Sequence, residues 1–145
     1  ESLKHGVLAG YPMVNIRATL FDGKYHPVDS KELAFKSAAR LAYKAACSAA
    51  NPVILEPICK AEVLVPDECM GDIIGDLNRR RGRILGMNPV DGMQEVVAEV
   101  PMSEMTKYAT DLRSITQGRG NFDMTFERYE EVPPNEASKI IENSK

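Results

Sequence analysis

The chain has 145 residues, of which 43% are hydrophobic and 27% charged, and its formal net charge is −3. This composition belongs to a globular protein and excludes a disordered chain, which would contain fewer apolar residues. The negative net charge argues against a protein that binds nucleic acid over its whole surface. No apolar run approaches the roughly 18 residues of a membrane-spanning helix, so we expect no membrane partner.

The first part of the chain predicts one strand and one long helix. Apolar and polar side chains alternate along Met13–Phe21, which is the period of a half-buried strand. A helix is expected over about Ser30–Ala50, with Asp29 as its N-cap, Glu32 completing a capping box and Pro52 ending it. One strand and one helix cannot bury a core by themselves. This part of the chain therefore looks like the second half of a larger domain.

From Pro57 onward the sequence predicts the element order β-α-β-β-α-β. Two helices that cover one face of a four-stranded antiparallel sheet make a ferredoxin-like fold, so we expect an α+β protein. Gly71 and Gly75 of the first helix are expected to allow close packing. The expected elements are a strand at Cys59–Val65, a helix from Met70, strands at Arg83–Met87 and Glu95–Val100 around the turn Asn88–Gly92, a helix capped by Ser103, a strand carrying Phe122, Met124 and Phe126, and a short terminal helix after Pro133 and Pro134.

No arrangement of residues for catalysis is recognisable. A catalytic site needs a nucleophile with a base, paired carboxylates, a metal cluster or a cofactor loop. His5 and His26 lack metal-ligand spacing, and the glycines at 118 and 120 precede a strand, whereas a dinucleotide-binding loop precedes a helix. We therefore predict no catalytic residue, no metal and no cofactor in this chain. The cysteines are expected to be reduced, buried thiols of a cytoplasmic protein: Cys47, Cys59 and Cys69.

Positive charge is concentrated in one place. Arg79, Arg80, Arg81 and Arg83 lie within five positions at the expected end of a helix. The simpler interpretation is a solvated helix end, where cations interact favourably with the helix dipole. The alternative is a local patch that binds phosphate, because the field of an exposed patch acts within a Debye length of about 8–10 Å whatever the net charge of the chain.

A set of short strings, in order and spread over nearly the whole chain, resembles translation elongation factor G of the bacterial type. Each string alone is weak evidence, but the ordered set is highly specific. The first residue is Glu instead of Met, which fits an excised segment of a longer protein. The strings are LAGYP at 8–12, DGKYH at 22–26, VDS at 28–30, LEP at 55–57, MGDIIGDLNRRRG at 70–82, YATDLRS at 108–114 and TQGRG at 116–120.

The resemblance implies two domains. Residues 1–51 would be the C-terminal half of domain IV, a βα unit similar to the second domain of ribosomal protein S5, and residues 52–145 would be the ferredoxin-like domain V with a C-terminal helix. The GTPase domain and domains II and III would lie outside this chain. The resemblance thus implies a GTPase that uses GTP and Mg in its full-length form, but no enzymatic activity and no cofactor in this part.

The resemblance also implies sites for ribosome contact. The tip of domain IV enters the decoding region of 16S rRNA and helps to move the tRNA–mRNA complex, and it matches Lys24, Tyr25, His26 and Asp29 here. A solvent-presented histidine can bond to phosphate, sugar or base edges, or it can be a loop residue without a partner. Domain V lies near the stalk base and the sarcin–ricin loop of 23S rRNA. Its matching candidates are Arg79, Arg80, Arg81, Gln117 and Arg119, some of which could instead contact the protein's own GTPase domain or domains II and III.

Three alternatives remain open. Thr106-Lys107 stands where the family usually has Phe-Gly, which leaves room for a paralogous translational GTPase of ribosome recycling or ribosomal protection. Ferredoxin-like domains also serve as regulatory modules that bind small ligands. An RNA-binding sheet of the stacking type is disfavoured, because Lys60 and Glu62 occupy sheet positions where that type has aromatic residues.

Overall fold

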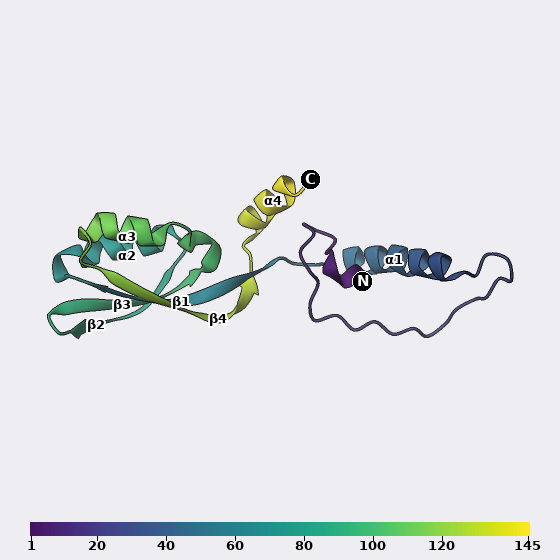
Figure 1. Cartoon of the computed structure of the whole chain (residues 1–145), viewed down its shortest axis with the longest axis horizontal. Helices are drawn as coiled ribbons and strands as arrows, with labels where there is room; N and C mark the ends of the chain where they lie inside the picture. The colour runs from purple at the N-terminus through teal and green to yellow at the C-terminus, as the bar shows by residue number, and fades with distance from the viewer. The chain divides into compact units, whose positions relative to one another are not determined.

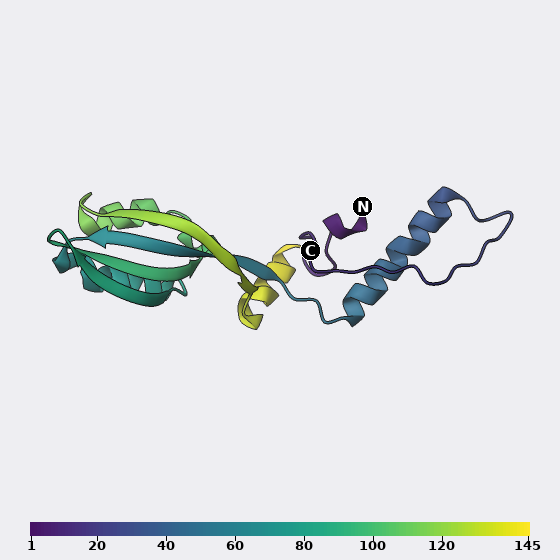
Figure 2. The same cartoon turned by 90° about the horizontal axis from the view of Figure 1, so that it is seen from below.

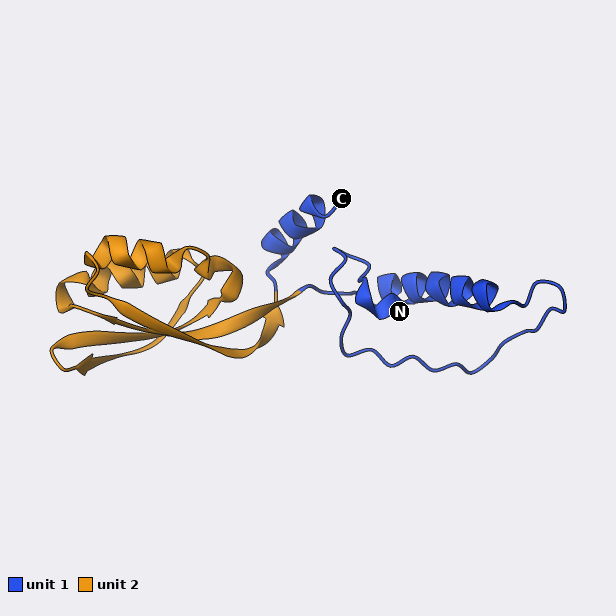
Figure 3. Ribbon diagram, viewed as in Figure 1, with its two compact units in different colours: residues 1–54, 132–145 blue, residues 55–131 orange.

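A computed structural model describes the whole chain, residues 1–145. It divides into two compact units, residues 1–54 with 132–145 and residues 55–131, which are coloured separately in Figure 3. The helices and strands, labelled in Figure 1, are α1 (Glu32–Ala49), β1 (Leu55–Val65), α2 (Met70–Arg79), β2 (Arg83–Val90), β3 (Met93–Pro101), α3 (Tyr108–Thr116), β4 (Asn121–Glu131) and α4 (Pro134–Asn143), with short 3₁₀ turns η1 (Ser2–Lys4), η2 (Asp67–Cys69) and η3 (Met102–Met105). No helix has the length and apolar character needed to cross a bilayer.

The unit of residues 55–131 is built on a four-stranded antiparallel sheet with the strand order β2-β3-β1-β4. Its two helices, α2 and α3, lie on the same face of this sheet, as Figures 1 and 2 show together. This is the ferredoxin-like arrangement that the element order predicted. All four strands fall within residues 55–131, so the sheet belongs to this unit alone.

The core of this unit lies between the sheet and the two helices. Alternate residues of the central strand β1 point into it, and Ala61 and Val63 stand directly opposite Ala98 and Val96 of β3. Each fully buried Val, Leu or Ile side chain contributes about 1.5–3 kcal/mol relative to exposure. The buried cluster consists of Ala61, Val63, Val65, Cys69, Ile73, Leu77, Val96, Ala98, Val100, Met105, Tyr108 and Leu112.

The other face of the sheet carries charged side chains in ion pairs. Lys60 Nζ lies 2.8 Å from Glu62 Oε1, and Glu99 accepts hydrogen bonds from both Arg83 and Arg128. Polar residues therefore occupy the face on which a stacking RNA-binding sheet would present aromatic rings.

Two local predictions in this unit are wrong. Ser103 does not cap α3, because the chain first makes the turn η3, which buries Met105, and α3 begins only after Lys107. Gly71 and Gly75 do not serve close packing, since a Cβ at either position would meet no atom within 4 Å.

In the other unit, α1 confirms the predicted long helix, but the predicted strand at Met13–Phe21 is wrong. A strand satisfies its backbone groups through a neighbouring strand, and residues 1–54 contain no strand at all. Leu20 and Phe21 are consequently both 94% exposed. The capping prediction also fails, because Lys31 is the N-cap of α1 and the Asp29 side chain makes no bond to the helix backbone. Near the C-terminus, Val132 N donates to Ile54 O at 2.9 Å.

Candidate functional site

The arginine triplet lies at the C-terminal end of α2. Arg79 is the last helical residue, Arg80 is the C-cap, and Arg81 adopts the left-handed conformation with φ 60°. Gly82 then turns close under the helix, where a Cβ would come within 2.6 Å of Leu77 O. The backbone reverses here, and the three consecutive side chains differ in exposure and in their sets of hydrogen-bond acceptors.

Arg80 is held inside the protein. Its side chain is only 13% exposed, and it donates to Asp76 Oδ2 from Nε at 2.8 Å, to Glu104 O from Nη1 at 2.6 Å, and to the carboxylate of Asp111 from Nη2. The guanidinium carbon also lies 5.1 Å from the centroid of the Tyr108 ring. Burial lowers the pKa of Arg80, but the hydrogen bonds to both aspartates outweigh burial and raise it. These contacts tie the end of α2 to the start of α3.

Arg81 is likewise engaged, but with other partners. It donates from Nη1 and Nη2 to the two oxygens of Glu56, and from Nε to Glu104 Oε1 at 3.2 Å. The hydrogen bonds to Glu56 are the main reason why its pKa is raised above the ordinary value. Since Glu56 lies near the start of β1, Arg81 connects the end of α2 to the first residues of the sheet.

Arg79 is the exposed member of the triplet. Its side chain is 77% exposed, and its one hydrogen bond runs from Nη2 to Asp76 Oδ1 at 2.7 Å. An open depression of about 490 Å³ lies beside it. The depression is lined by Asp76, Arg79, Arg80, Glu104, Asp111, Ser114 and Ile115.

The positive charge of this cluster is more than neutralised by carboxylates, which the run of arginines in the sequence did not indicate. Three guanidinium groups face four carboxylates, those of Glu56, Asp76, Glu104 and Asp111. None of these four carboxylates was predicted from the sequence. The spacing of Asp76, three and four residues before Arg79 and Arg80 on one helix, was a usable signal. The other three lie 25, 23 and 31 residues from their partners, so no local pattern could reveal them.

Gln117 and Arg119 lie in the loop between α3 and β4. Gln117 and Gly118 both have positive φ, 54° and 81°, and end the helix. Gly120 N donates to Thr116 Oγ1 at 2.9 Å, and a Cβ at this position would lie 2.8 Å from Thr116 Cγ2, so glycine here serves the folding of the loop. The Arg119 side chain is 51% exposed and pairs with Glu68 at 2.5 Å.

The two candidate sets of this unit lie at opposite ends of the helical layer. Arg119 pairs with Glu68, just before α2 begins, whereas Arg80 pairs with Asp111, in the first turn of α3. The length of α2, about 15 Å for ten residues, separates them. The structure therefore does not bring the triplet and the 117–119 loop together into one site.

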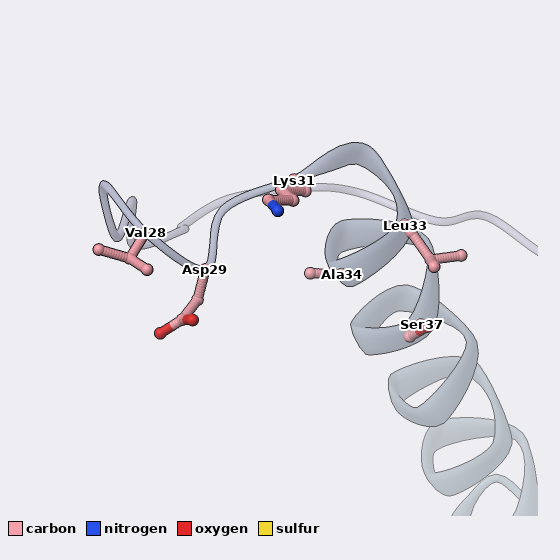
Figure 4. A pocket seen from close by; sticks show the side chains of 6 residues that line it. All are labelled: Val28, Asp29, Lys31, Leu33, Ala34 and Ser37. Atoms are coloured by element: carbon pink, nitrogen blue, oxygen red, sulfur yellow. The ribbon is translucent and has the colours of Figure 1, made fainter.

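The remaining candidates lie in the loop before α1, in the other unit. The side chains of His26 and Asp29 are 73% and 80% exposed, with His26 Nδ1 3.6 Å from Asp29 Oδ2, and His26 N donates to Ser30 Oγ. Lys24 and Tyr25 are exposed as well. A shallow depression of about 350 Å³ lies where this loop joins α1 (Figure 4), lined by Val28, Asp29, Lys31, Leu33, Ala34 and Ser37. The loop thus presents polar side chains to solvent with few partners of their own.

Comparison with known proteins places the chain in a family. Residues 1–51 match the family described as elongation factor G, domain IV, and residues 53–140 match elongation factor G C-terminus. A crystal structure from Thermus thermophilus is similar over 99% of this chain, with 45% sequence identity and a TM-score of 0.82. The match covers 22% of the Thermus chain, so the present chain spans about a fifth of that protein's length.

Proposed function

The chain belongs to the elongation factor G family, in its domain IV and C-terminal parts, and we propose that it is the ribosome-docking portion of a factor that promotes GTP-dependent translocation of tRNA and mRNA. The observation that carries this proposal is the match of both family parts, in order, over residues 1–51 and 53–140. The GTP chemistry would belong to a domain outside these two parts. The chain itself then acts by binding and positioning, with GTP and Mg held elsewhere in the full-length protein.

In this proposal the loop of Lys24, Tyr25, His26 and Asp29 contacts the decoding region of 16S rRNA and the tRNA–mRNA complex. Its support is the exposure of all four side chains and the scarcity of their internal partners. An exposed imidazole and phenol can stack on bases and bond to the RNA backbone. The loop is therefore suited to a partner that arrives from outside the protein.

The second contact, with 23S rRNA at the stalk base and the sarcin–ricin loop, would be made by the more exposed arginines. Arg79 and Arg119 have free guanidinium donors, and Gln117 lies beside Arg119 in an exposed loop. Arg80 and Arg81 would contribute indirectly, because their donors already bind Asp76, Asp111, Glu56 and Glu104. Docking of this kind uses arginine–phosphate contacts that position a protein without reading sequence.

The proposal is tested at both contacts. Co-sedimentation with purified ribosomes should retain this chain, and an Arg79→Ala, Arg119→Ala double variant should bind more weakly with a flatter dependence on salt. In the full-length factor, His26→Ala should slow translocation and leave multiple-turnover GTP hydrolysis on the ribosome nearly unchanged. Equal losses in the rates of translocation and GTP hydrolysis would contradict the proposal. So would a double variant that binds ribosomes as tightly as the unmodified chain.

One observation favours a second candidate, a paralogue that acts in ribosome recycling or ribosomal protection. Lys107 has φ 63°, a conformation that suits the glycine found there in the family, yet a lysine occupies it. A paralogue whose function differs from that of the elongation factor at this surface would explain why a lysine occupies this position. Assaying the full-length protein for translocation and for subunit splitting in parallel distinguishes the two candidates.

A further inference from the structure

Asp76 is the only carboxylate that binds two members of the arginine triplet. Its Oδ1 accepts from Arg79 Nη2 at 2.7 Å and its Oδ2 accepts from Arg80 Nε at 2.8 Å. The Asp76 side chain is 4% exposed, whereas that of Arg79 is 77% exposed. A buried carboxylate thus binds one nitrogen of a guanidinium whose side chain is mostly exposed to solvent.

The surroundings keep this carboxylate charged and fixed. Burial raises the pKa of Asp76, but the hydrogen bonds from Arg80 and Arg79 outweigh burial and hold the pKa below its ordinary value. Arg80 is itself bound by Asp111 and by the carbonyl oxygen of Glu104. Asp76 therefore has little freedom to move, and the position at which it accepts the hydrogen bond from Arg79 is fixed.

A fixed carboxylate that binds an exposed guanidinium reduces the conformational entropy that the arginine loses on binding RNA. Arginine has five N–H donors in a rigid planar fork, and one bond to Asp76 leaves the rest of the fork free for a phosphate. A long side chain that is already oriented loses less conformational freedom when it binds. We propose that Asp76 is a positioning residue, which orients Arg79 for contact with a phosphate of ribosomal RNA. This inference rests on the proposed docking function and adds a residue that does not itself touch the partner.

A role for Asp76 in neutralising the charge of Arg79, without orienting it, predicts the opposite change in RNA affinity when Asp76 is removed. If Asp76 only neutralised Arg79, then removing its charge would raise the positive potential at this surface, tighten binding to RNA and steepen the salt dependence. If Asp76 orients Arg79, its removal weakens binding, and the slope against salt stays the same because the number of cations is unchanged.

The test measures the affinity of this chain for purified large ribosomal subunits over a range of salt concentrations. Asp76→Asn should weaken binding about three- to tenfold, the range expected for releasing one long side chain, with an unchanged slope. Glu56→Gln is the matched control, since Glu56 is a carboxylate that binds Arg81 of the triplet but makes no hydrogen bond with Arg79 or Arg80. Its affinity should equal that of the unmodified chain. Tighter binding and a steeper slope for Asp76→Asn, or an equal loss in both variants, would overturn the inference.

A double-mutant cycle separates this inference from the docking proposal. In an Arg79→Ala background, Asp76→Asn should have no further effect on affinity, because its action passes through Arg79. If Arg79→Ala weakens binding but Asp76→Asn does not, only the positioning role fails. If Arg79→Ala changes neither affinity nor slope, both this inference and the role of Arg79 in docking fail.

Folding of each variant is checked by circular dichroism. If Asp76→Asn does not fold, Arg79→Lys carries the test, because it keeps the charge and removes the planar fork. Arg79→Lys should bind about three- to tenfold more weakly with an unchanged slope, and binding equal to that of the unmodified chain would overturn the inference.

Discussion

The guanidinium of Arg81 binds both oxygens of the Glu56 carboxylate, with Nη1–Oε1 and Nη2–Oε2 distances of 2.9 Å each. Glu56 is the second residue of β1, so this two-point contact fixes the start of the central strand to the end of α2. Parallel N–H···O bonds of this kind are among the stronger polar contacts in proteins, because both partners are charged. Arg81 holds this contact from a left-handed backbone, which costs a non-glycine residue energy.

This combination predicts an unusual ranking of substitutions at position 81. Arg81→Ala should lower the free energy of unfolding by about 2 kcal/mol, the value of hydrogen bonds to charged groups. Arg81→Gly loses the same contacts but relieves the left-handed strain, so it should cost about 1 kcal/mol less. Urea unfolding of this chain measures both. Arg83→Ala, which removes a 71% exposed arginine, serves as control. A glycine variant less stable than the alanine variant would contradict the argument.

Neighbouring arginines should differ sharply in their effect on stability. Arg80→Ala leaves the buried carboxylate of Asp76 with one partner fewer and should cost about 3 kcal/mol. Arg79→Ala removes a 77% exposed side chain and leaves the buried Asp76 carboxylate bound to Arg80, so it should cost less, about 1 kcal/mol. Thermal and urea unfolding of the two variants under the same conditions provide the comparison. Similar losses from both would mean that Arg80 is not held as the structure shows.

The contrast between these arginines shows what sequence could and could not predict. Periods of two and 3.6 residues predicted the ferredoxin-like unit, because Val63, Ile73 and Leu112 lie where those periods place core residues. No such period distinguishes Arg79 from Arg80, since their exposure depends on contacts with Glu104 and Asp111, distant in the chain.

The failed strand at Met13–Phe21 has a different physical cause. Its alternating pattern is real, but alternation describes only how side chains would divide between two faces. Whether a strand forms depends on a neighbour that accepts its backbone hydrogen bonds. Residues 1–54 contain no such neighbour, so the pattern remains without the structure that it predicts.

Two glycines are expected to respond in opposite ways to alanine. A Cβ at Gly120 would lie 2.8 Å from Thr116 Cγ2 and 2.9 Å from its Oγ1, so Gly120→Ala should destabilise the chain by about 1–3 kcal/mol. A Cβ at Gly75 meets nothing within 4 Å. Gly75→Ala in the middle of α2 should therefore stabilise the chain by about 0.5–1 kcal/mol, through the lower backbone entropy of the unfolded state. Differential scanning calorimetry of both variants tests this, and equal shifts in Tm would refute it.

Stability should fall in acid through Glu99. Hydrogen bonds from Arg128, assisted by the charge of Arg83, lower the pKa of Glu99 from 4.5 to about 2. Because the folded pKa lies below the unfolded one, the contribution is complete above about pH 4.5 and is lost as the pH falls toward 2. The midpoint of urea unfolding should therefore decline over this range. In Arg128→Gln the decline should be smaller, and the two proteins should converge in stability at the acidic end. A constant difference between them at every pH would exclude this pairing.

The pairing of Leu55 with Glu131 has a mechanical consequence. These are the residues at which the chain enters and leaves the ferredoxin-like unit, and they face each other at one end of the β1–β4 pair. A force that separates residues 54 and 132 would pull the two strands apart from that end, so that their hydrogen bonds would break one after another. Loading at opposite ends would instead shear all of the bonds together. The unit is thus less resistant to tension applied through residues 54 and 132, where the chain enters and leaves it, than to tension applied at opposite ends of the two strands. The Arg81–Glu56 contact lies beside the point where this separation would begin.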